Sequence, residues 1–316
     1  MPCELSIVIP AFNESSGLPR ALDRIKAIAA KASDSYEIIV VDDGSTDDTP
    51  GLIDTAHTRT PEIKGIILSR QFGKEAALYA GLKHASGKAV VTLDADLQHP
   101  PELIPDMLEH WRNGAEIVHG VKQDRGADSL KQRLTAAIYN GVFSRLSGFD
   151  LRGSSDFKLL DRRVVDVLTK KLPESGRFYR GLSAWVGYQQ ATVPFDVAPR
   201  KAGESQWGGL GLIRYALHTV TAFSSLPLMI MPVLGLVMLV IAVILGVEAI
   251  FSRLAGNSIS GFATLEITIL FAASMIMIGL GIIGQYMARM FDEIKGRPVC
   301  LISRSIGMNN SPENQL

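Results

Sequence analysis

The apolar run Ala89-Val90-Val91-Thr92-Leu93 leads directly into Asp94-Ala95-Asp96-Leu97-Gln98, and this change from apolar to acidic residues decides the fold. Such a run predicts a buried strand whose end reaches solvent. Because side chains alternate along a strand, Asp94, Asp96 and Gln98 are expected to project to one side. Mg²⁺ and Mn²⁺ prefer oxygen ligands, and Mg²⁺ usually binds one or two carboxylates and completes its shell with water and phosphates. We therefore predict that Asp94, Asp96 and Gln98 bind a divalent metal.

The same pattern of strand and helix begins earlier in the chain. Apolar runs predict strands at residues 5–10, 37–41, 65–69 and 89–93, with helices at residues 17–31 and 74–84 between them. This βαβ series implies a parallel sheet that binds its ligands at the carboxyl ends of the strands. The residues expected to meet there are Pro10, Glu14, Asp43, Asp94 and Asp96. The sequence supports neither a dinucleotide fold of the usual kind nor a P-loop, because it has no Gly-x-Gly-x-x-Gly after the first strand and no Walker lysine loop.

Six motifs occur in register along nearly the whole chain. They are Pro10-Ala11-Phe12-Asn13-Glu14, Val41-Asp42-Asp43-Gly44-Ser45-Thr46-Asp47, Gln71-Phe72-Gly73-Lys74, Asp94-Ala95-Asp96-Leu97-Gln98, Gly153-Ser154-Ser155-Asp156 and Arg200-Lys201-Ala202-Gly203-Glu204-Ser205. Together they resemble the family-2 glycosyltransferases that act on polyprenyl phosphates. Within that family the chain is most similar to dolichyl-phosphate mannose synthases and to the bacterial undecaprenyl-phosphate glucosyltransferases of O-antigen modification of lipopolysaccharide.

The resemblance implies an α/β fold of the GT-A type with a mostly parallel sheet, and a role for each motif. The implied nucleotide-sugar-binding residues are Pro10, Phe12, Glu14, Asp43, Lys74, Asp94, Asp96 and Arg200. Arg133, Arg200 and Ser205 are the implied acceptor-phosphate residues, and a guanidinium suits phosphate because it pairs in a bidentate way. The two arginines also fit a reading as surface cations, and Lys74 one as a helix-start cation.

Asp156 occupies the position of the catalytic base in related glycosyltransferases. A phosphate monoester has a second pKa near 6 and is already largely anionic at neutral pH. Asp156 is therefore predicted either to orient the acceptor or to accept a residual proton, the alternative being a buried capping residue. With a single candidate carboxylate, we expect one displacement that inverts the anomeric configuration.

Two long uncharged segments indicate attachment to a membrane. The chain is 47% hydrophobic, and no charged residue occurs from Thr219 to Val247 or from Ile267 to Ala288. About 20 apolar residues suffice to cross a bilayer. Two transmembrane helices are therefore predicted.

The segments that flank these spans predict how the protein lies at the membrane. Residues 131–143 place Leu134, Ile138 and Val142 on one helical face, and residues 206–225 are also amphipathic, so both fit either an interface helix or packing on the domain. We predict a GT-A catalytic domain at 1–205 with an interface helix at about 129–147, a juxtamembrane segment at 206–225, a transmembrane hairpin at 226–289 and a cytoplasmic tail at 290–316.

Charge and cysteine content predict the location of the catalytic domain. Arg289, Lys295, Arg297 and Arg304 follow the second span, whereas only Arg253 lies between the spans, so both termini are expected in the cytoplasm. No signal peptide is recognised at the N-terminus. The two cysteines, at opposite ends, favour a reducing compartment, and a net charge of zero gives no indication of nucleic-acid binding. We expect a multi-pass protein of the bacterial inner membrane.

The predicted reaction is transfer of a hexose, glucose from UDP-glucose by resemblance, to undecaprenyl phosphate with Mg²⁺ or Mn²⁺ as cofactor. Mannose, galactose, N-acetylhexosamine and a modified (amino-)arabinose remain open as donor sugars. A processive polysaccharide synthase would need more spans and a Gln-x-x-Arg-Trp motif, and a membrane scaffold would leave the acidic cluster unexplained. A homo-oligomer, a tetramer among the options, is expected because two spans leave much helix surface to cover.

Overall fold

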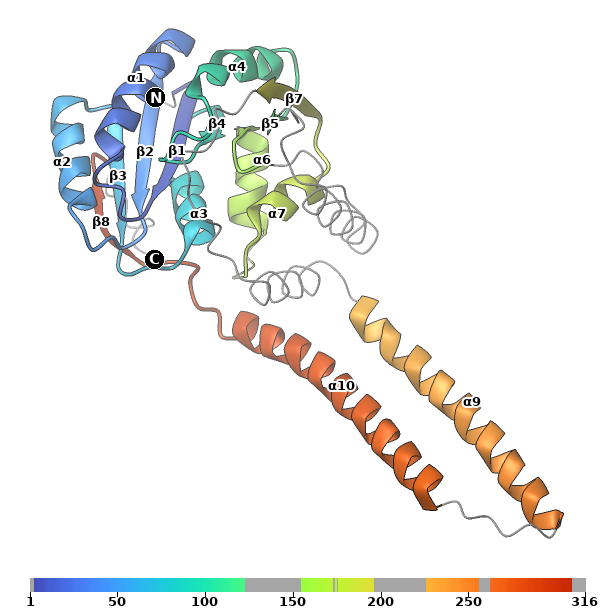
Figure 1. Ribbon diagram of the computed structural model, residues 1–316. Coiled ribbons are helices and arrows are strands. Elements are labelled where there is room, and N and C mark those ends of the chain that lie inside the picture. Colours follow the sequence, from blue (N-terminus) through green and yellow to red (C-terminus); the bar gives the residue numbers. More distant parts are fainter. Residues whose placement is uncertain are drawn as a thin grey trace. The chain divides into compact units, whose positions relative to one another are not determined.

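The computed structural model describes residues 3–122, 155–172, 174, 176–195, 226–255 and 262–308 (Figure 1). The chain divides into two compact units. The first contains Met1–Gln206 and Arg297–Leu316, and the second contains Trp207–Gly296. The predicted interface helix at 129–147 and the juxtamembrane segment at 206–225 lie outside the described residues.

The described strands of the first unit form one sheet, in the order β7-β5-β6-β4-β1-β2-β3-β8. The strands β4, β1, β2 and β3 are parallel to one another, and so are β5 and β7. In contrast, β6 is antiparallel to β4 and β5, and β8 is antiparallel to β3. The bounds are Leu5–Ala11 (β1), Tyr36–Asp42 (β2), Ile63–Leu68 (β3), Ala89–Thr92 (β4), Ile117–Lys122 (β5), Lys158–Asp161 (β6), Gln190–Phe195 (β7) and Ile302–Ile306 (β8). The mostly parallel α/β architecture predicted from the sequence is confirmed.

Helices pack against the sheet through small and branched apolar residues. They are α1 (Leu18–Ala32), α2 (Thr49–Arg59), α3 (Lys74–His84), α4 (Ile104–Arg112) after the 3₁₀ turn Pro101–Leu103, α6 (Arg162–Asp166), the π-helical turn Val167–Lys171, and α7 (Tyr179–Trp185). In α1, Leu22 and Ile25 belong to the same buried cluster as Ile7 of β1. On the other face of β1, Val8 lies so close to Gly81 of α3 that a Cβ at Gly81 would clash with it. Alternate residues of the strand thus fill two cores, as expected for a parallel sheet.

The early βαβ units lie within one or two residues of their predicted positions, but the C-terminal segment does not form the predicted tail. Residues 302–306 form β8, with Gly65 of β3 opposite Ile306. Strand β8 is also fixed to α2, because the guanidinium of Arg304 lies 2.8 Å from the carboxylate of Asp54. The isolated alternation Ile-Ser-Arg-Ser-Ile is that of an edge strand with one buried face.

The second unit contains two long apolar helices, α9 (Leu226–Leu254) and α10 (Phe262–Ile294). Their segments Met231–Glu248 and Ile267–Ile294 have mean hydropathies of 2.5 and 2.3, and at most 6% of either segment is buried. They meet at Gly279, where a Cβ would lie 2.7 Å from the sulfur of Met231. By length, composition and exposure they are candidate membrane spans, and α10 continues beyond residue 289, where the sequence placed its end.

Candidate active site

A cleft of about 340 Å³ opens at the carboxyl ends of β1 and β2, beside the start of α3. Parallel α/β sheets bind their ligands at this edge. Seven of the residues predicted to bind a nucleotide sugar line the cleft: Pro10, Phe12, Glu14, Asp43, Lys74, Asp94 and Asp96. The other predicted positions Arg133, Arg200 and Ser205 lie outside the described residues. The structure brings the seven together, and their roles in binding remain predictions.

The loop after β1 is fixed against the loop after β2 by short polar side chains. Asn13 takes a positive φ of 55°, a conformation that Asn tolerates better than most residues. Its amide N donates to Ser45 Oγ at 2.8 Å, and its Oδ1 accepts from Thr46 N at 2.9 Å. Asp47 accepts from the amide N of Ser15 at 3.0 Å. These bonds shape the wall of the cleft that carries Phe12 and Glu14.

Asp43 lines the cleft and also holds the turn that leads into α3. Its Oδ1 accepts from Phe72 N at 2.7 Å and its Oδ2 from Gly73 N at 2.9 Å. Burial raises the pKa of Asp43, although these backbone hydrogen bonds oppose the shift. The neighbouring Gly44 has a φ of +70°, and a Cβ there would lie 2.7 Å from Gln71 N. Asp43 therefore fixes the turn that presents Lys74.

The acidic stretch after β4 is a turn, so the expectation of a strand with Gln98 beside the aspartates is wrong. The strand ends at Thr92, although the amide of Leu93 still bonds to Val8 O at 3.0 Å. Leu97 then takes a φ of 55°, which breaks the alternation. Gln98 donates its backbone N–H to Asp96 Oδ1 at 3.0 Å, and it is not among the residues that line the cleft. A metal-binding role for Gln98 stays a prediction.

Asp94 and Asp96 fit a divalent cation by their chemistry. Both line the cleft, and burial together with the charges of Asp96, Asp47 and Asp94 raises the pKa of Glu14. Such an excess of negative charge favours a cation. The described residues contain no cluster of three or more His, Cys, Asp or Glu side chains placed as metal ligands. A site with two carboxylates and open positions suits a metal whose shell a diphosphate completes.

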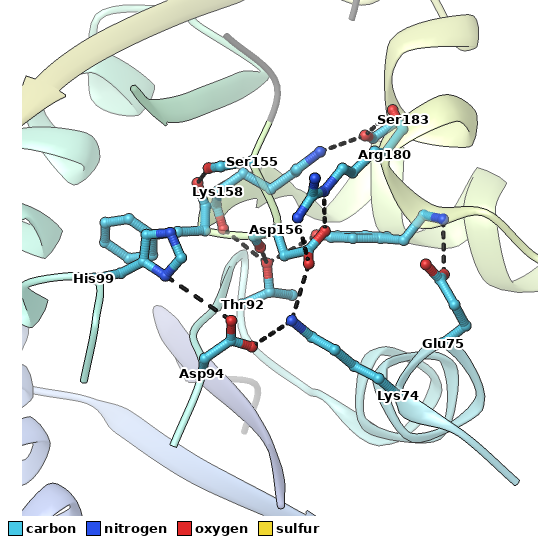
Figure 2. A network of polar contacts seen from close by, with 12 residues as sticks. Lys74, Glu75, Thr92, Asp94, His99, Ser155, Asp156, Lys158, Arg180 and Ser183 are labelled. Carbon is cyan, nitrogen blue, oxygen red and sulfur yellow. Dashed lines mark hydrogen bonds and ion pairs between the residues drawn. The ribbon is translucent and has the colours of Figure 1, made fainter. Parts of the chain in front are cut away.

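Asp156, predicted as the catalytic residue, lies at the centre of an ion-pair cluster (Figure 2). Arg180 of α7 donates from Nε to Asp156 Oδ1 at 2.7 Å and from Nη2 to Oδ2 at 3.0 Å. Lys74 Nζ lies 2.9 Å from Asp156 Oδ2 and 2.7 Å from Asp94 Oδ1, and so joins the two carboxylates. Burial raises the pKa of Asp156, but hydrogen bonds and charges from Arg180 and Lys74 outweigh it and hold the pKa well below its usual range. The carboxylate is therefore ionised and a weak base.

A buried polar layer supports this cluster. Glu75, next to Lys74, accepts at Oε2 from the amide N of Tyr179 at 2.7 Å, and burial raises its pKa to about 6. Lys158 of β6 is fully buried and donates to Ser183 Oγ at 2.6 Å, and burial lowers its pKa to about 7. The hydroxyl of Thr92 donates to the backbone O of Asp156. The N-terminus of α7 is thus fixed to α3 and to the sheet.

His99 follows Gln98 but is placed by aromatic packing. Its ring centroid lies 5.4 Å from that of Phe157 and 5.6 Å from that of Phe195. Its Nδ1 is 3.9 Å from Asp94 Oδ2, which is too long for a hydrogen bond. Burial lowers the pKa of His99, although Asp94 opposes this effect. The ring forms an apolar support behind Asp94.

Sequence reasoning missed Arg180, Glu75 and Lys158. A lysine within the otherwise apolar run Phe157-Lys158-Leu159-Leu160 is a signal that marks a buried charge with a partner. Arg180 and Glu75 carry no such local signal, because their partners come from distant parts of the chain.

The chain is similar to a known protein family and to proteins of several bacteria and phages. The model of the glycosyl transferase family 2 matches residues 6–165. An uncharacterized glycosyltransferase of Synechocystis sp. is 38% identical over 318 residues, which cover 100% of both chains. The bactoprenol glucosyl transferase of Shigella phage SfII is 36% identical over 96% of this chain and 98% of its own length.

A further relative and a solved structure are also similar to the chain. The prophage bactoprenol glucosyl transferase homolog of Escherichia coli K12 is 35% identical over 95% of this chain and 99% of its own. Among solved structures, glucosyl-3-phosphoglycerate synthase from Mycobacterium tuberculosis in complex with Mn²⁺, UDP-glucose and phosphoglyceric acid is 20% identical, with a TM-score of 0.44 over 69% of this chain and 78% of that one. The GT-A-like α/β domain, the family match and the near-full-length relatives together show that the chain belongs to glycosyl transferase family 2.

Proposed function

We propose that this protein transfers a hexose from a nucleotide diphosphate sugar to a polyprenyl phosphate. The observation that carries the proposal is the cleft in which Asp94 and Asp96 lie beside Lys74, which in turn contacts Asp156. Relatives named bactoprenol glucosyl transferase, similar over almost the whole chain, support a lipid phosphate as acceptor. An acidic pocket for the donor thus adjoins two exposed cations, Lys74 and Arg180, that suit a second anion.

The donor side needs neutralisation of the leaving diphosphate. Asp94 and Asp96 are the residues that would hold Mg²⁺ or Mn²⁺, and the cation would supply electrostatic stabilisation of the departing charge. Phe12 and Pro10 provide an apolar wall to the same cleft, and Lys74 an ammonium group at its edge. The residues of the cleft therefore combine the apolar and charged contacts that a nucleotide diphosphate requires.

The acceptor side needs orientation more than proton transfer. A phosphate monoester is largely dianionic at neutral pH. Asp156, whose pKa is held well below its usual range by Arg180 and Lys74, would take up a proton only with difficulty. Of the two roles that the sequence left open, orientation of the acceptor is the one that we propose.

The two apolar helices suit an enzyme whose acceptor stays in lipid. We propose that α9 and α10 cross the bacterial inner membrane and that the catalytic domain and both termini face the cytoplasm, with homo-oligomers formed through the helices. The exposed apolar side chains of both helices support the spans. Protease treatment of inside-out and right-side-out vesicles tests this orientation, and cleavage of the catalytic domain only from the outside would reverse it.

The donor sugar is the part of the reaction that needs a direct experiment. We propose UDP-glucose, with mannose, N-acetylhexosamine and amino-arabinose donors as the competing outcomes. Purified protein should be incubated with undecaprenyl phosphate and a panel of nucleotide sugars, with and without a chelator, and the lipid product weighed by mass spectrometry. The expected product is the lipid phosphate with a single added hexose, and it should not form when chelator is present. Failure to form a glycolipid with any donor of the panel would overturn the proposal. A polymeric product would instead indicate a processive synthase. Such a synthase needs more membrane helices to form a polymer channel than the two candidate spans of the described residues.

The stereochemistry tests the mechanism separately. Attack by the lipid phosphate opposite the leaving diphosphate inverts the anomeric carbon in one displacement, so α-linked UDP-glucose should give a β-linked glucosyl phosphate. The three-bond coupling between the protons on C1 and C2 of the glucose distinguishes the two products by NMR. An α-linked product would require a second nucleophile and would overturn the single displacement.

A further inference from the structure

We propose that Arg180, with Lys74 beside it, binds the phosphate headgroup of the acceptor, and that Asp156 is the anchor that positions these two cations (Figure 2). The inference rests on the proposed function and names the acceptor site within it. The sequence assigned this role to Arg133 and Arg200, which lie outside the described residues, whereas Arg180 belongs to no motif identified in the sequence.

The exposure of the three side chains shows which of them an incoming ligand meets. The side chain of Asp156 is 14% exposed, whereas those of Lys74 and Arg180 are 43% and 45% exposed. The carboxylate therefore lies beneath, and the ammonium and guanidinium groups face solvent. An anion that approaches the cluster contacts the two cations first.

The charges also favour a phosphate. Arg180 and Lys74 carry two positive charges, which the carboxylates of Asp156 and Asp94 balance, so the attraction for a phosphate monoester, with a charge of about −1.5 to −2 at pH 7, comes from the exposed guanidinium and ammonium groups and not from a net charge. A guanidinium presents several N–H donors in one plane and can contact a carboxylate and a phosphate along different edges. Lys74 lines the donor cleft, so a phosphate bound here would lie beside the donor. Such proximity is what transfer between the two substrates requires.

The position of Arg180 is fixed before any ligand binds. It is the second residue of α7, and the amide of the preceding Tyr179 donates to the half-buried carboxylate of Glu75 at 2.7 Å. Later in the same helix, Ser183 accepts from Lys158 at 2.6 Å. A charged group held in place in this way loses little side-chain entropy when it binds a ligand.

A second arginine of the chain makes the same ion pair without any of these features. Arg24 of α1 donates to Glu102 from Nε at 2.7 Å and from Nη2 at 2.8 Å. Its side chain is 45% exposed, as is that of Arg180, but its partner is 46% exposed and not buried beneath it. Arg24 does not line the donor cleft. It is therefore a matched control in residue type, pairing geometry and exposure.

The experiment measures binding of farnesyl phosphate, a short prenyl phosphate, to the full-length protein in detergent by titration calorimetry. Arg180→Gln should weaken this binding about 10- to 100-fold, since an ionic hydrogen bond is lost, and Arg180→Lys should give an intermediate loss. Arg24→Gln should bind as the wild type does. Farnesol, which lacks the phosphate, should not distinguish the four proteins. The nucleotide-sugar KM of Arg180→Gln should stay within about 3-fold of the wild-type value, because only the acceptor side is changed.

The outcomes separate the inference from the function on which it rests. Equal farnesyl phosphate affinity in Arg180→Gln and Arg24→Gln would overturn the inference. It would also be overturned if Arg180→Gln lost farnesol binding as much as farnesyl phosphate binding. If Arg180→Gln melts at a much lower temperature than the wild type, Arg180→Lys decides, because it retains the pair with Asp156 and loses only the fork. The proposed function fails in a different way, when wild-type protein makes no glycolipid from any donor of the panel.

Discussion

Around the donor cleft Asp43 and Asp47 are held by backbone N–H groups, whereas at the acceptor side Asp156 is held by side-chain cations. Asp43 accepts from the amides of Phe72 and Gly73, and Asp47 from that of Ser15. Asp156 instead pairs with Arg180 and Lys74. The first arrangement shapes loops, and among the carboxylates of the cleft Asp94 pairs with Lys74. The second neutralises its carboxylate and presents positive charge to solvent.

The difference indicates that the two sides bind different substrates. A cleft with surplus negative charge suits a donor that arrives with a divalent cation, and a pair of exposed cations suits a lipid phosphate that arrives alone. Lys74 is the one described residue whose ammonium contacts carboxylates of both sides. The following changes test whether the two sides act separately.

The largest effect is expected for Asp96→Ala on the donor side. Asp96 is an exposed carboxylate of the cleft, and its removal leaves too few charged ligands for a cation. Transfer should fall on the order of 10³-fold or more, and nucleotide-sugar binding should no longer respond to added Mg²⁺ or Mn²⁺. Glycolipid formation and donor titration with and without chelator measure both. Asp34→Ala, at an exposed aspartate outside the cleft, is the control, and full activity of chelator-treated wild type would refute the metal assignment.

Asp156→Asn should lower turnover on the order of 10²-fold while the nucleotide-sugar KM stays within about 3-fold of wild type. Asn keeps the size of the side chain but removes the charge that anchors Arg180 and Lys74. Steady-state kinetics with varied donor give both constants. A donor KM that rises as much as turnover falls would mean that the two sides do not act separately.

Gly44→Ala should act on the donor side alone and raise the nucleotide-sugar KM about 10-fold through strain in the loop. Its φ is +70°, and a Cβ would lie 2.7 Å from Gln71 N, so the turn that Asp43 holds must move. Gly114→Ala is the matched control, because it has a φ of +101° but open space around the Cβ position. Equal donor KM values in the two variants would show that the turn does not set donor affinity.

The smallest effect is a pH dependence of stability from Glu75 on the acceptor side. Burial raises the pKa of Glu75 from 4.5 to about 6, so the folded protein binds this proton more tightly than the unfolded chain does. The contribution to stability is complete below about pH 4.5 and is lost as the pH rises to about 6. Glu75→Gln keeps an oxygen acceptor for the Tyr179 amide but cannot titrate.

The melting temperature of Glu75→Gln should therefore rise relative to that of the wild type by about 2–4 °C between pH 4.5 and 7. Thermal melts of the full-length protein in detergent at several pH values measure this difference. Glu109→Gln, at an exposed glutamate of α4, is the control for the charge change. A constant difference across that range would contradict titration of the Glu75 carboxyl between pH 4.5 and 7.

The sequence predicts the donor side well because its contacts are local. The strand Leu5–Ala11 is buried along almost its whole length, and the polar residues after it bond to those after β2, the next strand along the chain. Periodicity and turn chemistry therefore place Asn13, Asp43 and Asp94 near their true positions. The prediction fails at Gln98, because the positive φ of Leu97 depends on a turn that alternation cannot reveal.

The acceptor side escapes sequence reasoning because its contacts are distant along the chain. Glu75 bonds to Tyr179, and Lys74 to Asp156, across 104 and 82 residues. Such pairs follow from the tertiary fold, and no spacing rule marks them. Strand β8 was missed for the same reason, since five alternating residues acquire a partner only when β3 lies beside them.

Strand β8 also has a consequence for how the protein is made. The outer edge of β3, complete at Leu68, pairs with residues 302–306, which follow both apolar helices in the chain. A ribosome that adds roughly 5–20 residues per second leaves that edge open for on the order of ten seconds or more. An unpaired strand edge invites pairing with other chains. The sheet of this protein is therefore completed only after both apolar helices have been synthesised, and the edge of β3 needs protection during the interval.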